Sequence, residues 1–487
     1  MARGEIDGFL ALRPHQRAAW HMFLVQLATL AVESAGRQSL PEDADAWAEM
    51  LRALTPDWAG DEPWCLLVEE PAAPAFLQPP DPGGLKWNDV ATPDALDILI
   101  TSKNHDLKAH VIAEAQPDDW VMALVSLQTM AGYDGRGNYG IARMNGGSSS
   151  RPLLGLVTPP ERQGSVHPSR WWRRDVQRLL ALRREGWPGP CAIGGKALLW
   201  CEPWPEGNLL QVADLDPLFI EVARRVRMRR SDRGLFALTS TSQKARVNAA
   251  AFNGALGDAW APVHRTENKS LTLGEGRFDY RRMKALLFDA DWLRPPLAEL
   301  APNEKAGEMA VLAEALGRGN SKTYGLQSRL IPLPHSSGAL FGVDAPAARL
   351  AAAILEDVDA AESALKSAAA LYLARGDRAA IRKEHRQAAG ASVSALDTRV
   401  DRVFFPALWR RLKAVEEGRE YDEQQAFRRQ LAEWAEAELE QVFAAFPVAS
   451  ILAPRARVRA RSALRRALRK ADFFETGGQG DAIVAAG

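Results

Sequence analysis

Cysteine is scarce in this chain: Cys65, Cys191 and Cys201 are the three that occur among its 487 residues. No two of them form a CxxC pair, so the sequence offers neither a disulfide framework nor the ligand spacing of a structural zinc site. A small, odd number of cysteines is typical of a reducing compartment. The sequence therefore predicts a protein without disulfides or structural zinc.

Long apolar runs are also missing. The first residues, MARGEIDGFLALRPHQ, contain neither a long apolar core nor a small-residue cleavage site, so no secretory signal is visible. The apolar run from Met22 to Val32 is too short to cross a bilayer. We therefore expect a cytoplasmic protein that has no membrane partner.

The chain has no net charge, because its 61 basic and 61 acidic residues cancel. A neutral chain has no global field that attracts a polyanion, so any contact with nucleic acid has to come from local basic patches. With 47% hydrophobic and 25% charged residues, the composition is that of an ordinary soluble protein. The length exceeds what one ordinary core needs and predicts two or three domains.

Catalytic motifs are absent as well. The eight histidines form no HExxH and no His-x-His pair, which favours core or surface roles for them. The segments Gly194–Ala197 and Ser321–Thr323 each lack residues that a phosphate loop requires, and no GxSxG occurs. The sequence therefore predicts no catalytic residue, no cofactor and no metal site.

The pattern of predicted elements changes near residue 345. The part before it contains helical patterns, strand candidates and a proline-rich connection over 71–84. Predicted helices there span 14–35, 43–54, 92–100, 120–130, 171–184, 216–230 and 309–316, and strand candidates span 197–201 and 235–247.

After that point alanine dominates and long helical patterns follow one another, separated by short breaks that contain glycine or proline. These predicted helices span 347–375, 378–387, 392–417, 423–446 and 455–472. We therefore predict an α+β fold, with a large mixed globular domain over residues 1–345 and a C-terminal antiparallel four-helix bundle over residues 346–487.

The segment Gly132–Arg151, GYDGRGNYGIARMNGGSSSR, is rich in glycine, serine and asparagine. Exposed N–H groups of such a loop form concavities that bind anions, and its arginines, Arg136, Arg143 and Arg151, suit phosphate. The spacing is not that of a nucleotide-binding motif, which favours a longer polyanion over ATP. The alternative interpretation is a flexible surface connection.

Basic patches occur elsewhere too. The segment Arg455–Lys470 holds eight cations and no acid, and on a helix Arg455, Arg459, Arg466 and Lys470 share one side. Arg457, Arg461 and Arg465 form an adjoining stripe. Such a helix suits a polyanion, or it is a solvated face balanced by the acidic helix Glu423–Glu440. The arginines of Arg224–Arg230 and Arg170–Arg174 allow the same two interpretations.

The loop GRGNSKTYG, Gly317–Gly325, is small, polar and basic. Such a tip can enter a groove of DNA and contact base edges or phosphates. The alternative is a plain hairpin turn.

Taken in order, several segments resemble one known family. They are AFLQPP (75–80), NDVATPDALDIL (88–99), GGSSSRP (146–152), LLWCEPW (198–204), GDAWAPV (257–263), the loop GRGNSKTYG and the basic last helix. In this order they resemble the CasA family, the large subunit of the type I-E CRISPR Cascade surveillance complex. The likeness covers roughly residues 60 to 475.

The resemblance implies a non-enzymatic subunit of antiviral defence. Family members recognise a protospacer-adjacent motif (PAM) in double-stranded DNA, help open the duplex into an R-loop for guide-RNA pairing, and recruit the helicase-nuclease. The implied partners are the other Cascade subunits CasB, CasC, CasD and CasE, the CRISPR guide RNA and double-stranded target DNA.

The family reads the motif from the minor groove with a glycine loop, a lysine finger and a wedge. By position, the glycine loop would be Gly137, Asn138, Tyr139 and Gly140, or else Gly146 and Gly147. Lys244 and Lys269 are both candidates for the finger, and the wedge would be Gly319, Asn320, Ser321 and Lys322. Lys103, Asn104 and His105 would dock the guide-RNA end of the complex. The basic face of the bundle, Arg455, Arg459, Arg466 and Lys470, would touch the small subunits and the displaced strand.

Two other functions remain open at this point. One is a metal-dependent nuclease that uses Asp89, Asp94 or Asp97 with magnesium, although carboxylates so spaced more often begin a helix. The other is a purely structural scaffold subunit whose basic helix binds an acidic protein.

Overall fold

The computed structural model of the chain describes residues 1–99, 114–144, 146–160, 166–319, 322–335 and 339–474. The chain forms two compact units. The first unit comprises Met1–Phe278 and Ala290–Ser336, and the second comprises Asp279–Asp289 and Ser337–Gly487. The short segment Asp279–Asp289 therefore lies with the second unit, although it precedes the boundary near residue 345 that the sequence suggests.

Helices of the first unit enclose a core rich in tryptophan. They are α1 (Arg17–Ser34), α2 (Ala44–Arg52), α4 (Pro117–Met130) and α5 (Pro168–Glu185), which confirms four predicted helices. Helix α1 is buried on nearly all sides because it is apolar all round, as expected for a core helix. It packs with Trp120, Trp200 and Trp260, each of which is fully buried.

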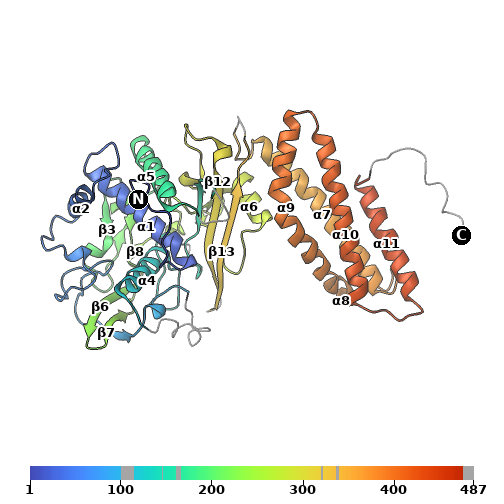
Figure 1. Cartoon of the computed structure of the whole chain (residues 1–487). Coiled ribbons are helices and arrows are strands. Elements are labelled where there is room, and N and C mark those ends of the chain that lie inside the picture. The colour runs from blue at the N-terminus through green and yellow to red at the C-terminus, as the bar shows by residue number, and fades with distance from the viewer. Residues whose placement is uncertain (100–113, 145, 161–165, 320–321, 336–338, 475–487) are drawn as a thin grey trace. The chain divides into compact units, whose positions relative to one another are not determined.

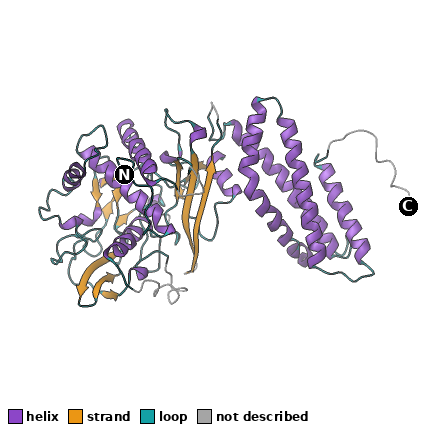
Figure 2. Cartoon of the chain, in the orientation of Figure 1, coloured by secondary structure: helices purple, strands orange, loops and turns teal. Residues whose placement is uncertain are grey.

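The described strands lie in the first unit, in small sheets (Figure 2). The two that position the candidate site have the orders β1-β7-β6 and β13-β12-β2. The smaller ones have the orders β10-β9-β11, β3-β5 and β4-β8. The strands are β1 (Asn88–Val90), β2 (Leu153–Val157), β3 (Lys196–Leu198), β4 (Leu210–Gln211), β5 (Leu215–Ile220), β6 (Arg225–Ser231), β7 (Gly234–Ser240), β8 (Val247–Asn248), β9 (Val263–His264), β10 (Lys269–Ser270), β11 (Trp292–Leu293), β12 (Ala310–Gly319) and β13 (Lys322–Pro332).

Two helix predictions in the first unit are wrong. Residues 216–230 form most of β5 and β6, and residues 309–316 lie largely in β12. Short apolar runs fit a helix or a strand equally well from periodicity, and here pairing with distant strands decides. Strand β12 pairs with β2, more than 150 residues earlier, in the register Ala310 opposite Val157. The predicted helix 92–100 forms a single 3₁₀ turn, Pro93–Ala95, within its described residues.

The described structure of the second unit is helical (Figure 2). Its elements are α6 (Tyr280–Phe288), α7 (Pro346–Leu373), α8 (Lys383–Ala388), α9 (Gly390–Glu416), α10 (Glu420–Ala445) and α11 (Ala453–Lys470). The long helices α7, α9, α10 and α11 form the predicted antiparallel bundle around alanine, leucine and phenylalanine side chains (Figure 1). None of the described helices of the chain has both the length and the apolar character needed to cross a membrane.

Candidate nucleic-acid interface

Two arginines anchor the second half of the glycine-rich segment in the core of the first unit. Arg151 is 2% exposed and donates hydrogen bonds of 2.7 Å from Nε and from Nη2 to the carboxylate of Asp258. Arg143 is 3% exposed, donates to the carbonyl of Pro217 at 2.8 Å and lies over the ring of Phe219. The expectation that these two arginines bind phosphate is therefore wrong, because neither reaches solvent. The described residues around Arg143 and Arg151 are also held by contacts of the fold, unlike a flexible surface connection.

Burial shifts the pKa values of this cluster. It lowers the pKa of Arg143 to about 10, and repulsion from Arg151 acts in the same direction. Burial alone would raise the pKa of Asp258, but the charge and hydrogen bonds of Arg151, the charge of Arg143 and the N–H of Trp260 together outweigh it and keep this pKa below its ordinary value. Glu221 accepts a hydrogen bond of 2.7 Å from the backbone N–H of Ala142, and burial raises its pKa to about 7. Paired and hydrogen-bonded in this way, the cluster is a desolvated anchor for the glycine-rich segment.

The turn Gly137–Gly140 packs against the segment that follows β7. The N–H of Ser242 donates to the carbonyl of Gly137 at 3.1 Å, and the hydroxyl of Tyr139 donates to the carbonyl of Gln243 at 3.0 Å. Gly137 has a φ of +86°, and a Cβ there would lie 2.7 Å from the Cβ of Thr241, so no side chain fits. The next residue after Gln243 is the exposed Lys244. The first predicted glycine loop and one candidate finger are thus neighbours.

The other candidate finger has different surroundings. Lys269, in β10, forms an ion pair with Glu267. The next residue, Ser270, packs against Gly254, and so does the carbonyl of Arg143. Strand β10 therefore lies beside the stretch that leads to Gly146 and Gly147. Lys244, by contrast, makes no ion pair with any residue that the structure describes. A finger needs a cation free to meet DNA, so the geometry favours Lys244.

Strands β12 and β13 form a long hairpin that ends in the predicted wedge (Figure 1). Gly319 lies opposite Lys322 at its end, while Asn320 and Ser321 lie outside the described residues. Lys322 is exposed, and its Nζ lies 5.3 Å from the ring centroid of the partly exposed Tyr324. The described end of the hairpin therefore presents a cation and an aromatic ring.

Hydrogen bonds join this hairpin to the glycine-rich segment. The hydroxyl of Ser149 and the N–H of Ser150 donate to the carbonyl of Leu316 at 2.8 and 3.1 Å. Closer to the tip, Arg318 lies 3.3 Å from Asp134, whose N–H donates to the carbonyl of Asn138 in the glycine turn. The turn, the Lys244 segment and the hairpin end thus form one connected structure, although they are far apart in the sequence.

Two of the three carboxylates of the nuclease hypothesis, Asp94 and Asp97, have structural partners. Asp94 forms an ion pair with Arg13 at 2.5 Å. Asp97 accepts hydrogen bonds of 2.7 Å from His15 and from Gln16. Because Asp94 and Asp97 each face a separate partner, these two carboxylates do not converge on one metal position, and Asp89 is exposed on β1. No group of three His, Cys, Asp or Glu residues suited to a metal ion occurs in the described part of the chain.

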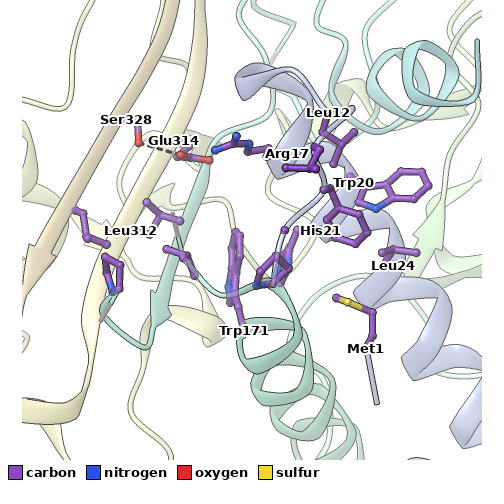
Figure 3. Close-up of a pocket in the computed structure, with 17 residues that line it drawn as sticks. Met1, Leu12, Arg17, Trp20, His21, Leu24, Trp171, Leu312, Glu314 and Ser328 are labelled. Carbon is purple, nitrogen blue, oxygen red and sulfur yellow. Dashed lines mark hydrogen bonds between the residues drawn. The ribbon is translucent and has the colours of Figure 1, made fainter. Parts of the chain in front are cut away.

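A cavity of about 400 Å³ lies between α1, α5 and the strands β12 and β13 (Figure 3). His21 lines it, stacked on Trp171 with ring centroids 3.4 Å apart, and its Nε2 lies 2.8 Å from the carboxylate of Asp175. Burial lowers the pKa of His21, as expected for a core histidine. Opposite it, Glu314 accepts a hydrogen bond of 2.8 Å from Ser328. These titratable groups are thus held in local pairs.

The basic last helix carries two different stripes. Arg461 and Arg465 form ion pairs of 2.7 and 2.9 Å with Glu440 and Glu436 of α10. A groove of about 910 Å³, called here the basic groove, lies along the other side of α11. Its remaining walls come from α7, α8 and the α7–α8 connection. Its cationic lining residues are Lys366, Arg378, Arg386, Arg459, Arg466 and Lys470, and none of its described lining residues is acidic.

Three cations of the basic groove could be recognised from the sequence, and the other three could not. Arg459, Arg466 and Lys470 were visible as one face of a predicted helix. Lys366, Arg378 and Arg386 join them through the packing of α7 and α8 beside α11, which no local pattern signals. Arg455, the fourth predicted residue of that face, is exposed but does not line the groove. Lys103, Asn104 and His105 lie outside the described residues.

Comparison with protein-family models finds no match, and neither does comparison with the sequences of curated proteins. Solved structures do match. Thermus thermophilus CasA, also called Cse1, shares 16% sequence identity with this chain, with a TM-score of 0.62 over 96% of this chain and 94% of that one. The chain has the CasA fold. This confirms, for the fold, the resemblance that the motifs indicated.

Two other solved structures are CasA proteins under their second name, Cse1. Acidimicrobium ferrooxidans Cse1, a CRISPR-associated protein, has a TM-score of 0.53 at 15% identity, over 96% of this chain and 93% of that one. Thermobifida fusca Cse1 has the same TM-score and identity, over 94% of this chain and 91% of that one. The likeness therefore extends through both units.

Proposed function

We propose that this chain is the large subunit of a type I-E CRISPR Cascade complex in the cytoplasm. In this role it recognises the PAM in double-stranded DNA, helps open the duplex for pairing with the guide RNA, and recruits the helicase-nuclease. One observation supports the proposal most: in a chain with the CasA fold, the glycine turn is hydrogen-bonded to Ser242 and Gln243, directly before the exposed Lys244, and is linked through Asp134 to Arg318 near the hairpin end. The partners are CasB, CasC, CasD, CasE, the guide RNA and target DNA.

In this proposal the turn Gly137–Gly140 and Lys244 approach the minor groove, and the hairpin end with Lys322 inserts at the first base step. Minor-groove readout is degenerate, so a reader with few side chains tolerates several motif sequences. Unstacking a base step costs about a few kcal/mol, which phosphate contacts and guide pairing offset. The arginine anchor around Asp258 supports this role because insertion requires a rigid tip.

The basic groove would receive the displaced DNA strand once the duplex opens. Single-stranded nucleic acid suits a cationic channel without acids, because binding then releases counterions from every neutralised phosphate. The groove lies on the predicted basic face of the bundle. No step of the proposed function needs a catalytic side chain in this subunit.

The test is duplex opening by the reconstituted complex. An assembly of the other subunits, guide RNA and this chain would be mixed with duplexes that carry randomised motifs and a fluorescent base beside the motif. We expect Lys244→Ala to weaken motif-dependent binding and Asn320→Ala with Lys322→Ala to slow opening. Lys269→Ala is the matched control, since Lys269 is already paired with Glu267. Equal opening by all variants would reject the assignment of these residues.

The same assay separates the two other functions. Magnesium-dependent cleavage by the isolated chain would support a nuclease. An assembly that binds and opens motif-bearing duplexes equally well without this chain would support a scaffold. We favour recognition because Asp94 and Asp97 are engaged by Arg13 and His15 rather than placed around a shared metal.

A further inference from the structure

A small polar cavity lies beside the glycine turn in the first unit. It has a volume of about 210 Å³, the share of about seven liquid waters. Its walls come from β1, β6, β7, β12, α4, the glycine turn and the stretch Ala95–Ile98. The volume is below that of pockets for drug-sized ligands, so it suits a single polar group carried by a larger molecule.

Two nearly buried guanidinium groups line this cavity. Arg224 of the β5–β6 connection is 9% exposed and Arg318 of β12 is 4% exposed. Arg224 donates a hydrogen bond of 2.8 Å to the carbonyl of Gly132, at the start of the glycine-rich segment. Burial lowers the pKa of Arg224 to about 10, and Arg318 is close enough to lower it further by repulsion. Two like charges held together out of water favour an anion between them.

Asp134 supplies part of that negative charge in the structure. Its carboxylate lies 3.3 Å from Nη2 of Arg318, and its charge also acts on Arg224. The side chain of Asp134 is 48% exposed, whereas the two arginines are nearly buried. The carboxylate therefore lies at the mouth of the cavity, between the guanidinium groups and solvent.

The other charged groups around the cavity already have partners. Arg225 forms an ion pair of 2.8 Å with Glu206 and lies over the ring of Trp204. Asp97 accepts hydrogen bonds from His15 and Gln16, and its charge also acts on Arg318. Asp134 is thus the described acid at the cavity that water reaches most easily.

We propose that this cavity binds a backbone phosphate of the target DNA, with Arg224 and Arg318 as its ligands. In the absence of DNA, Asp134 takes the place of the phosphate. Arginine suits this exchange because its planar fork binds carboxylate and phosphate in the same geometry. The site would fix the strand next to the glycine turn and the hairpin end, so the inference rests on the proposed function and adds a positioning contact to it.

The decisive variant is Asp134→Asn in the reconstituted complex. Removing the competing carboxylate should tighten duplex binding about fivefold, because the phosphate no longer has to displace a charge. It should also steepen the dependence of log K on log salt by about one unit. If Asp134 has only a structural role, binding by the variant should be weaker or unchanged, and the salt dependence should keep the same slope. Either of those results overturns the inference.

A second measurement identifies the phosphate. A set of duplexes would be made, each with a single neutral methylphosphonate at a different position near the motif. The affinity of each duplex would be measured for the unaltered complex and for an Arg318→Lys complex. We expect one position whose neutralisation weakens the unaltered complex and has little effect on the variant. Absence of such a position overturns the inference. Guide-RNA loading and thermal melting of the variant check that it assembles and folds.

Two controls keep the outcomes distinct. If the unaltered complex shows no motif-dependent binding, the proposed function fails; if it binds and Asp134→Asn changes nothing, this inference alone fails. Inorganic phosphate at constant ionic strength tests the alternative source. One outcome is that phosphate stabilises the chain against heat, and stabilises the Asp134→Asn variant more, while the DNA affinity of the variant is unchanged. This outcome would assign the site to a free anion and overturn its assignment to DNA.

Discussion

In the first unit Arg151 lies inside the fold and donates two hydrogen bonds of 2.7 Å to Asp258, whereas in the second unit Arg466 lies exposed along the basic groove. Both arginines come from stretches whose cations the sequence suggested as contacts for a polyanion. The first unit uses buried arginine to hold irregular backbone. Arg227 donates to the carbonyls of Ala73 and Glu70, and Arg246 donates to those of Pro203 and Glu202.

The difference follows from how each unit satisfies its backbone. The helices of the second unit satisfy most of their backbone groups internally, so arginine side chains remain available at the surface. The first unit contains long connections without regular structure, whose buried carbonyls need donors, and arginine has five N–H groups to offer. A run of arginines therefore indicates an ion-binding surface only where the backbone around it needs no donors.

The largest expected effect comes from breaking the buried pair. Arg151→Met should lower the free energy of unfolding of the first unit by about 3–5 kcal/mol, because it leaves the carboxylate of Asp258 buried with a weaker partner. Urea denaturation followed by tryptophan fluorescence measures this, since Trp409 and Trp434 are the only tryptophans of the second unit. The exposed Arg466→Met should change the free energy by less than about 0.5 kcal/mol. Equal losses would remove the distinction between the two kinds of arginine.

The second prediction concerns Glu221, which is buried among the same arginines. Its pKa is raised from 4.5 to about 7, so the folded state holds its proton more strongly than the unfolded state does. Stability should therefore fall as pH rises from about 4.5 to about 7 and then level off, with Glu221 contributing about 3 kcal/mol to the fall.

Replacing the carboxyl sharpens this test. Glu221→Gln should flatten that part of the stability curve and leave the first unit more stable than the unaltered chain at pH 8. Denaturation across pH 5 to 8, again followed by tryptophan fluorescence, measures both curves. Parallel curves would show that Glu221 does not titrate in this range.

The third and smallest effect compares the two stripes of α11. Arg466→Ala with Lys470→Ala should lower the slope of log K against log salt for a single-stranded oligonucleotide by about 1.4, and weaken binding about tenfold. Arg461→Ala with Arg465→Ala removes the same charge, yet these arginines are paired with Glu440 and Glu436, so the change should be less than half as large. Fluorescence anisotropy with the isolated chain measures both. Equal changes would mean that charge alone, and not the groove, determines binding.

Local patterns were sufficient for much of the architecture. The helices of the bundle and helices α1, α2, α4 and α5 follow from apolar periodicity, proline near the first turn and glycine at the breaks. The order of several short motifs indicated the CasA fold, which the solved structures confirm. The end of the hairpin was also visible as the small, polar loop Gly317–Gly325.

Local patterns failed where distant partners decide. Residues 225–230 were predicted as the end of a basic helix, but pairing with β7 makes them part of a strand, in which Arg225 and Arg227 are buried. From the sequence, the arginines of the glycine-rich segment were interpreted as phosphate ligands. In the structure Arg151 is instead paired with Asp258, which lies more than 100 residues further along the chain. Likewise, Lys244 and Lys269 could be told apart only by their surroundings in the fold.

The sequence by itself determined the helices of the bundle, the glycine turns and the supply of cations, because these depend on neighbours within a few residues. Tertiary structure alone decided which cations are buried and which meet solvent. It also brought the glycine turn, Lys244 and Arg318 together from three distant segments. The physical reason is that the charge of an arginine is fixed by its chemistry, while its partner is fixed by the path of the rest of the chain.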